Sequence, residues 1–274
     1  HSNLIYSAFD PRFNVVSLPY LFDSSADADE KLDGEAGEMM KEILKEYGLH
    51  CMGIAENGFR QLTNNVREVK SVEDMKNLKI RVAGSNLLME CYRRWGADAT
   101  NMNWSETYTA LQQKTVEGQE NPLPAIDAAS VQEVQPYCSM WNAIYDCLFF
   151  CINQDIYDAL TPEQQAVVDE CGQKAVQYER YINRSGDEEI MSRWEKSNGV
   201  TFTKKEDMDI DSFVMPANND ASENKLNSGV DLQFSVMKDC ENKEAAYEVL
   251  NFLLKDENVP VSYTHLTLPT ILRV

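Results

Sequence analysis

The sequence is short of positive charge and has no long apolar segment. Its 274 residues include 25 Lys and Arg against 45 Asp and Glu, a formal net charge of −20, and its pI is about 4.5. Nucleic acids and anionic membrane surfaces are bound by basic surfaces, so this balance argues against both as partners. A membrane-spanning helix needs about 18 or more consecutive apolar residues, and the sequence contains no such run. An anionic ligand would require a cleft in which positive charge is concentrated locally.

Paired cysteines, histidine clusters and common catalytic motifs are also missing. The seven cysteines are an odd number without framework spacing, and no Cys-x-x-Cys is present. His50 beside Cys51 lacks further zinc ligands, since there are three histidines in all. There is no Gly-x-Ser-x-Gly, His-Glu-x-x-His or phosphate-binding loop. We therefore expect no metal and no cofactor, and we expect Cys147 and Cys151, which share one apolar run, to be core residues.

The middle of the chain predicts alternating strands and helices. Ser71 with Asp74 is typical of a capped first turn. Next come a strand over 78–82, a helix over 85–95 ended by Gly96, a helix over 105–117 capped by Ser105 and ended by Gly118, and a strand that closes at Asn121. Alternation of this kind indicates an α/β fold.

The flanking segments add further elements. These are a strand over 15–20, a helix over 24–47, a strand over 49–55, a helix over 125–134 and a buried strand over 143–152. Thr161-Pro162-Glu163-Gln164 begins a helix that is expected to reach about Lys196. Its length would be roughly 50 Å. Gly172 and Gly186 are places where it could bend or break.

Two polar residues lie where an α/β sheet binds ligands. Arg81 lies within an otherwise apolar strand, and Asn121 follows a glycine at the end of another. Ligands bind at the carboxyl ends of such strands, and a guanidinium matches a carboxylate in a bidentate contact. From the residues alone, an arginine on a strand such as Arg81 more often pairs with a local acid or faces water, and Asn121 before Pro122 is more often a turn residue.

Four motifs together resemble the TRAP-transporter solute receptors, the DctP-type extracytoplasmic binding proteins. They are GFRQLTN at 58–64, LKIRV at 78–82, the segment 105–112 and GQENP at 118–122. The resemblance extends from about Phe9 to about Thr203. It implies an α/β, two-lobed periplasmic-binding-protein-like fold with a long helix spanning both lobes.

The resemblance also implies roles for individual residues. Arg81 would form the salt bridge to the substrate carboxylate, with Arg60 and Asn121 helping to hold the same group. Trp104 would pack on the ligand body. Glu120 belongs to the same predicted ligand site, and we interpret it as an acid that orients an arginine in preference to a catalytic group. A family position that is often polar falls near Gly84 here, where the chain departs from the pattern.

The resemblance gives a domain division as well. Residues 1–56 and 147–185 are expected to form lobe one, and 57–146 with 186–212 lobe two, which carries the carboxylate site. Because the family begins with elements not found before His1, we interpret lobe one as N-terminally truncated and the signal segment as absent from this chain. Residues 213–259 resemble a strand–helix fragment of an ABC-type sugar-binding protein. Residues 260–274 form a tail, of which 261–274 resemble adapter-derived read-through.

The implied function is that of the solute-binding subunit of a TRAP transporter. It would capture a small organic acid between its lobes, as a monomer outside the cytoplasm, and deliver it to membrane permease subunits. Two alternatives remain open from sequence. One is a sensing module for organic acids, and the other is an enzyme that uses Glu120 as acid or base beside Arg81. The identity of the acid is not defined by these residues.

Overall fold

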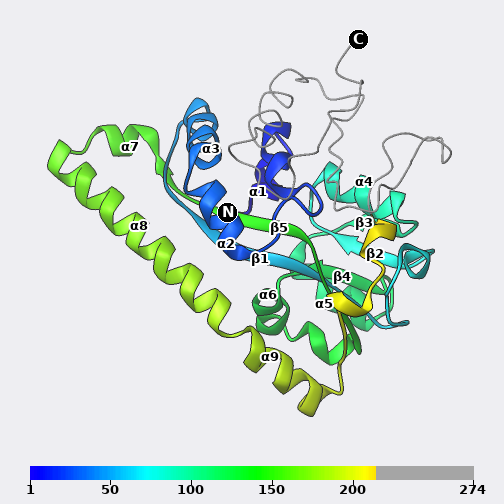
Figure 1. Ribbon diagram of the computed structural model, residues 1–274. Coiled ribbons are helices and arrows are strands. Elements are labelled where there is room, and N and C mark those ends of the chain that lie inside the picture. The colour runs from blue at the N-terminus through cyan, green and yellow to red at the C-terminus, as the bar shows by residue number, and fades with distance from the viewer. Residues whose placement is uncertain (214–274) are drawn as a thin grey trace, which may run out of the picture. The chain divides into compact units, whose positions relative to one another are not determined.

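A mixed β-sheet organises residues 1–213, the part of the chain that the computed structural model describes (Figure 1). Within that part the sheet has six strands in the order β3-β2-β4-β1-β5-β6. They are β1 (Leu49–Asn64), β2 (Lys79–Val82), β3 (Asp98–Asn101), β4 (Gly118–Asn121), β5 (Tyr137–Asn153) and β6 (Thr201–Lys204). β2 is parallel to β3 and β4, β1 is antiparallel to β4 and β5, and β5 is parallel to β6. The predictions made for residues 213–259 and 260–274 fall, except at Phe213, outside the part of the chain that the structure describes.

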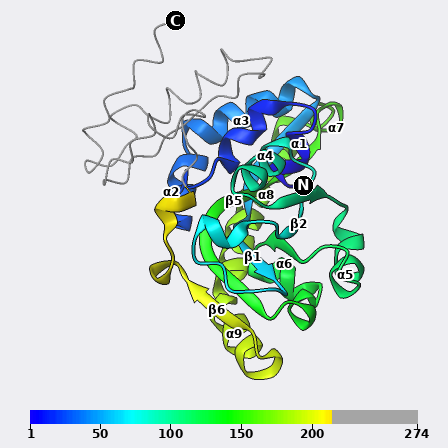
Figure 2. The same cartoon turned by 90° about the vertical axis from the view of Figure 1, so that its right-hand side faces the viewer.

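The helices alternate with these strands. They are α1 (Asn3–Tyr6), α2 (Ser25–Leu32), α3 (Glu35–Glu46), α4 (Asn86–Arg94), α5 (Trp104–Gln112), α6 (Leu123–Ala128), α7 (Gln154–Asp158), α8 (Pro162–Ser185) and α9 (Asp187–Arg193). A π-helical turn, Trp194–Asn198, leads from α9 toward β6 (Figure 2). Across residues 1–213, every helix is too short or too polar to traverse a bilayer. The succession β2-α4-β3-α5-β4 confirms the predicted alternation.

The paired strands β1 and β5 are the longest in the described sheet. Their register runs from Leu49 opposite Asn153 to Asn64 opposite Tyr137. It shifts between Cys51 and Gly53, between Glu56 and Gly58, and between Arg60 and Leu62. Each shift inserts residues that have no partner in the ladder, as a β-bulge does. The strand expected over 49–55 therefore continues without a break through the motif that carries Arg60.

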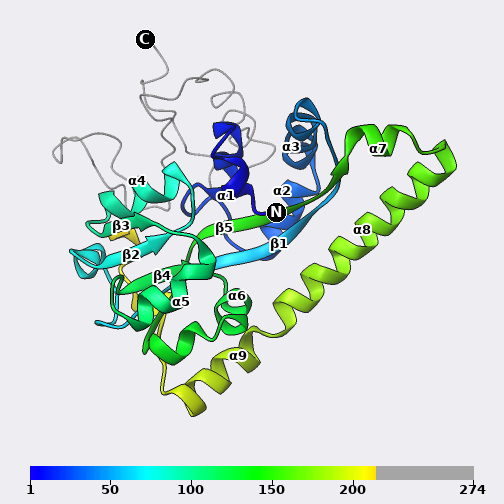
Figure 3. The same cartoon turned by 180° about the vertical axis from the view of Figure 1, so that it is seen from behind.

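Helices cover both faces of β1 (Figure 3). Ile54 points toward α3, where its Cδ1 atom lies 3.3 Å from the position of a Cβ on Gly37, whereas Gly53 faces Val176 of α8. Arg180 of α8 donates to both carboxylate oxygens of Asp33, at 2.7 and 2.8 Å. Arg184, one turn later, donates to Asp29 at 2.7 and 2.8 Å and also contacts buried Glu56. These contacts fasten α8 to α2 and to β1.

The capping predictions are confirmed. The Asp74 carboxylate accepts from the Ser71 N–H at 2.9 Å, which completes a capping box on a 3₁₀ turn. Ser85 accepts from the N–H of Leu88 and caps α4. Thr161 and Gln164 form the capping box of α8, with Pro162 at its first position. In each case a short side chain satisfies backbone donors that the first turn leaves unpaired.

Four predicted boundaries are wrong. Residues 15–20 do not form a strand, because Pro11–Ser17 is a 3₁₀ helix whose first turn Asp10 caps. The expected helix over 24–47 is divided, since Gly34 separates α2 from α3. The helix expected over 105–117 starts at Trp104, has Asn103 rather than Ser105 as N-cap, and ends at Gln112, just before Lys114 at φ 59°. The helix expected over 125–134 breaks at Ser130, where φ is 54°.

The two glycines of the long C-terminal helix behave differently. Gly186 separates α8 from α9 and confirms one of the expected breaks. Gly172 lies within α8, which continues through it, so the helix does not break there. A Cβ on Gly172 would lie 2.5 Å from the Cβ of Met52 in β1. The glycine therefore allows close approach of helix and strand.

We predict that Asp187, the first residue of α9, makes stability depend on pH. One of its carboxylate oxygens is buried without a hydrogen-bond partner among residues 1–213. Burial, reinforced by the charge of Glu56, raises the pKa of Asp187 from 3.8 to about 6. Between these values the folded state holds the proton more tightly than the unfolded state, so this group's contribution to stability falls as pH rises through about 6.

Asp187→Asn removes that titration. In thermal unfolding, the variant should match the wild type near the unfolded pKa of 3.8 and exceed its Tm well above the folded pKa of about 6. A difference in Tm that stays constant across this range would contradict the assignment.

Candidate functional site

Arg81 lies at the carboxyl end of the parallel strands. It occupies β2, opposite Thr100 of β3 and Gln119 of β4. Its Nε and Nη2 atoms donate to the carbonyl oxygen of Met102, at 2.9 and 2.7 Å, just beyond the end of β3. The guanidinium carbon lies 5.4 Å from the ring centre of Trp104, the first residue of α5, in a cation–π contact.

The charge of Arg81 has no carboxylate partner in the part of the chain that the structure describes. No acidic oxygen there lies within salt-bridge distance of it, and its Nη1 atom donates no hydrogen bond to residues 1–213. The side chain is nevertheless buried, with 4% of the residue exposed. Burial lowers the pKa of Arg81 to about 10, although the charge of Glu120 acts in the opposite direction. An anion at this guanidinium would offset the cost of desolvating it.

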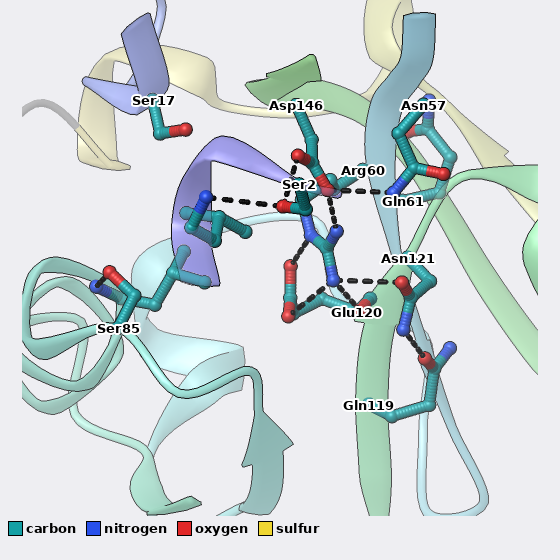
Figure 4. Close-up of polar contacts among 12 residues, drawn as sticks. Ser2, Ser17, Asn57, Arg60, Gln61, Ser85, Gln119, Glu120, Asn121 and Asp146 are labelled. Atoms are coloured by element: carbon teal, nitrogen blue, oxygen red, sulfur yellow. Dashed lines mark hydrogen bonds and ion pairs between the residues drawn. The ribbon is translucent and has the colours of Figure 1, made fainter. Parts of the chain in front are cut away.

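Arg60 has the opposite environment, because acceptors from its own chain surround it (Figure 4). Nε pairs with the Glu120 carboxylate and Nη1 with the Asp146 carboxylate. Nη2 donates to the backbone oxygen of Glu120 at 2.8 Å and to Oδ1 of Asn121 at 2.8 Å. The side chains of Arg60, Glu120 and Asp146 are all buried. Arg60 on β1 thus connects β4 to β5 through an internal ion-pair cluster.

A chain of amides holds Asn121 in place. Its Oδ1 accepts from Arg60, and its Nδ2 donates to Oε1 of Gln119 at 2.9 Å. Gln119 donates in turn to the hydroxyl of Thr63 at 2.8 Å, and that hydroxyl donates to Gln135 at 3.1 Å. The orientation of the Asn121 amide is therefore determined by its neighbours on both sides.

The structure separates the five predicted site residues into two groups. Arg60, Glu120 and Asn121 form one hydrogen-bonded cluster, and Arg81 with Trp104 forms a second. Strand pairing of Arg81 with Gln119 and the charge interaction of Arg81 with Glu120 connect the groups. Contact of any of these residues with a ligand stays a prediction.

Asp146 is the important residue that sequence reasoning missed. It accepts from Ser2 at 2.6 Å and from Asn57 at 2.7 Å in addition to Arg60. A charged residue within the apolar run 143–152 was the available signal, because a buried carboxylate requires a partner. His50, the residue considered for a metal, instead contacts Asp169 at 2.7 Å and stacks on Tyr157. Across residues 1–213, no group of three His, Cys, Asp or Glu side chains is placed to hold a metal ion.

Residues 1–224 match the family model of the bacterial extracellular solute-binding proteins, family 7, or DctP. The chain therefore belongs to this family, which confirms the resemblance found in its motifs. The match is wider than the expected range of about 9–203, and it extends beyond Phe213 into the segment expected to be foreign.

Relatives and solved structures agree with the family match. The 2,3-diketo-L-gulonate-binding periplasmic protein YiaO of Escherichia coli is 31% identical over 208 residues, which cover 76% of this chain and 62% of that protein. A TRAP periplasmic solute-binding protein of Polaromonas, bound to D-erythronate, has 29% identity and a TM-score of 0.74 and aligns over 77% of this chain and 69% of its own. The sugar acid-binding protein DctPAm of Advenella mimigardefordensis, in complex with galactonate, has 32% identity and a TM-score of 0.70 over 74% and 65%.

These neighbours are two-lobed TRAP periplasmic binding proteins, so the predicted fold class is confirmed. The chain spans about 62% of the length of the curated relative from Escherichia coli. The residues at which one lobe passes into the other stay a prediction.

We predict that Arg60 is required for stability. Arg60→Ala leaves two buried carboxylates, Glu120 and Asp146, without their cation, and this should lower the free energy of unfolding by about 3–5 kcal/mol. Urea denaturation followed by circular dichroism measures the change.

Arg193→Ala is the matched control. It removes an arginine whose ion pair with Asp127 is half exposed, with 49% of the Arg193 side chain accessible, and should cost no more than about 1 kcal/mol. Equal losses in the two variants would show that the Arg60 cluster is not a major source of stability.

Proposed function

We propose that this protein is the solute-binding receptor of a TRAP-type transporter. It captures a small organic acid outside the cytoplasm and delivers it, as a monomer, to membrane permease subunits. The observation that carries the proposal is the buried guanidinium of Arg81, which lacks a carboxylate partner within residues 1–213. Membership of the DctP family supports the same function.

The ligand carboxylate is assigned to Arg81 because of its free donor geometry. Nε and Nη2 are already oriented by the Met102 carbonyl, which leaves Nη1 to donate to a ligand oxygen. A guanidinium held from one side loses little further freedom on binding, so the contact is preorganised. Arg60 supports the site indirectly, since it fixes Asn121 and occupies the Glu120 carboxylate that would otherwise compete for Arg81.

The ligand class that we infer is the sugar acids. Proteins named for or bound to 2,3-diketo-L-gulonate, D-erythronate and galactonate are among the relatives. Each ligand carries a carboxylate and a hydroxylated chain. Trp104, beside Arg81, offers an aromatic surface against which the carbon chain of such a ligand can pack.

An enzymatic role for Glu120 is disfavoured. Its side chain is fully buried and is held by Arg60, so it is not available to transfer a proton to or from a ligand. A sensing role uses the same ligand site and differs only in the protein that recognises the bound form. We favour transport because the family is defined by extracellular solute binding.

Substitutions of Arg81 test the site. Lysine retains the charge without the fork, so Arg81→Lys should weaken sugar-acid binding by about 1–3 kcal/mol. Arg81→Ala leaves the bound carboxylate unpaired and should weaken binding by about 3–5 kcal/mol. Titration calorimetry with galactonate measures both.

Arg67→Ala provides the control. Arg67 also donates to backbone carbonyls, those of Asp74 and Lys76, at 2.9 and 2.8 Å, but it is not part of the site. It should change the Tm without changing affinity. If folded Arg81→Ala binds galactonate as tightly as the wild type, Arg81 is a structural residue and the site assignment fails.

A receptor should release its ligand unchanged. After prolonged incubation with the protein, galactonate should be recovered intact by mass spectrometry. A product that appears with the wild type and disappears in Glu120→Gln would instead identify an enzyme.

A further inference from the structure

Cys51 and Cys151 occupy directly opposite positions in the ladder between β1 and β5. Opposite residues in antiparallel strands have Cα atoms about 4.5–5.5 Å apart. Disulfides span Cα separations of about 4.4–6.8 Å, so this register is compatible with a bond between the two sulfurs without rearrangement of the backbone. Both cysteines are free thiols in the structure.

The register also excludes the other cysteines of β5 as partners. Cys51 is the one cysteine of β1, whereas β5 contains Cys138, Cys147 and Cys151. Cys138 lies opposite Thr63, and Cys147 lies opposite Glu56. Cys147 is also engaged by Asn3, whose Oδ1 accepts from its backbone N–H at 3.1 Å. The β1–β5 ladder therefore selects a single cysteine pair.

The two thiols have complementary environments. Cys51 is buried, whereas Cys151 is partly exposed. The interaction between the two thiols lowers the pKa of Cys51 and raises the pKa of Cys151. In its protonated form the Cys51 thiol donates to the carbonyl oxygen of Gly53 at 3.3 Å, next to the first β-bulge. Cys151 is thus the more exposed thiol, and Cys51 is the thiol that loses its proton more readily.

We propose that Cys51 and Cys151 are a redox pair that closes into a cross-strand disulfide when the protein meets a small-molecule disulfide. In the first step Cys151, the more exposed cysteine, loses its thiol proton to water and its sulfur attacks the oxidant, which forms a mixed disulfide and releases one thiol. The interaction with Cys51 raises the pKa of Cys151, so the proton has to be removed as this bond forms. The Cys51 thiolate then attacks the Cys151 sulfur and releases the second thiol. The protein loses two hydrogens, and the oxidant is reduced to two thiols.

The bond would join the first residues of β1 to the last residues of β5. Arg60, Glu120 and Asp146 lie farther along the sheet, beyond the second bulge. The disulfide should therefore stabilise the folded protein, because it restricts the unfolded chain, and it should leave the Arg81 site unchanged. This inference does not depend on the proposed function.

Oxidised glutathione is the probe. The full chain is reduced, freed of reductant and incubated with the probe, then alkylated, digested and mapped by mass spectrometry. We expect a peptide pair linked through Cys51 and Cys151, and a rise in Tm of about 5–15 °C that dithiothreitol reverses. Mapping of the wild type requires no variant, so loss of folding cannot obscure the result.

Variants separate the pair from its neighbours. In Cys51→Ala the second step is blocked, and Cys151 should stay as the glutathione adduct. Cys147→Ala and Cys171→Ser, which remove a buried and an exposed thiol outside the pair, should retain the link. A wild-type protein in which Cys151 carries glutathione while Cys51 still reacts with the alkylating reagent would overturn the proposal. So would a link between Cys51 and Cys147.

Discussion

The rest of the described structure depends on the enclosure of one arginine, Arg60, by carboxylates of its own chain. Its guanidinium contacts β4 through Glu120 and Asn121 and β5 through Asp146. Buried charges are tolerated when they are paired and hydrogen-bonded, and here every nitrogen of the guanidinium has an acceptor. Because Glu120 is occupied by Arg60, Arg81 on β2, the strand next to β4, has no acidic partner within residues 1–213. The unpaired charge of Arg81 is therefore a consequence of the ion pairs that Arg60 makes.

Local chemistry made a large part of the fold predictable. Ser71, Ser85 and Thr161 each satisfy donors within the next few residues, so their role as caps is encoded in a short segment. The succession from β2 to β4 follows from hydrophobic periodicity in the same way. Arg81 could be selected from sequence as a candidate ligand-binding residue because a charged residue is unusual in an apolar strand.

The remaining features depend on residues far apart in the sequence. Ser130 adopts a left-handed backbone conformation that a serine at this position does not predict. A side chain at position 172 would collide with Met52 of β1, so the need for Gly172 depends on another element. Arg60 and Arg81 are both arginines on strands, yet Arg60 is enclosed by Glu120 and Asp146 and Arg81 is not. That distinction arises only when β1, β4 and β5 are assembled, so the division of the candidate site into two groups could not be read from its motifs.

The bulges in β1 make the length of this strand as important as its composition. Side chains alternate between the two faces of a sheet with a period of two, so each extra residue reverses the face on which the following residues lie. Asn57 is the extra residue of the second bulge, and Arg60 follows it. Loss or gain of one residue here would turn the guanidinium away from Glu120 and Asp146, even though every motif residue was retained. Among relatives of this chain, β1 should therefore tolerate substitutions far better than insertions or deletions.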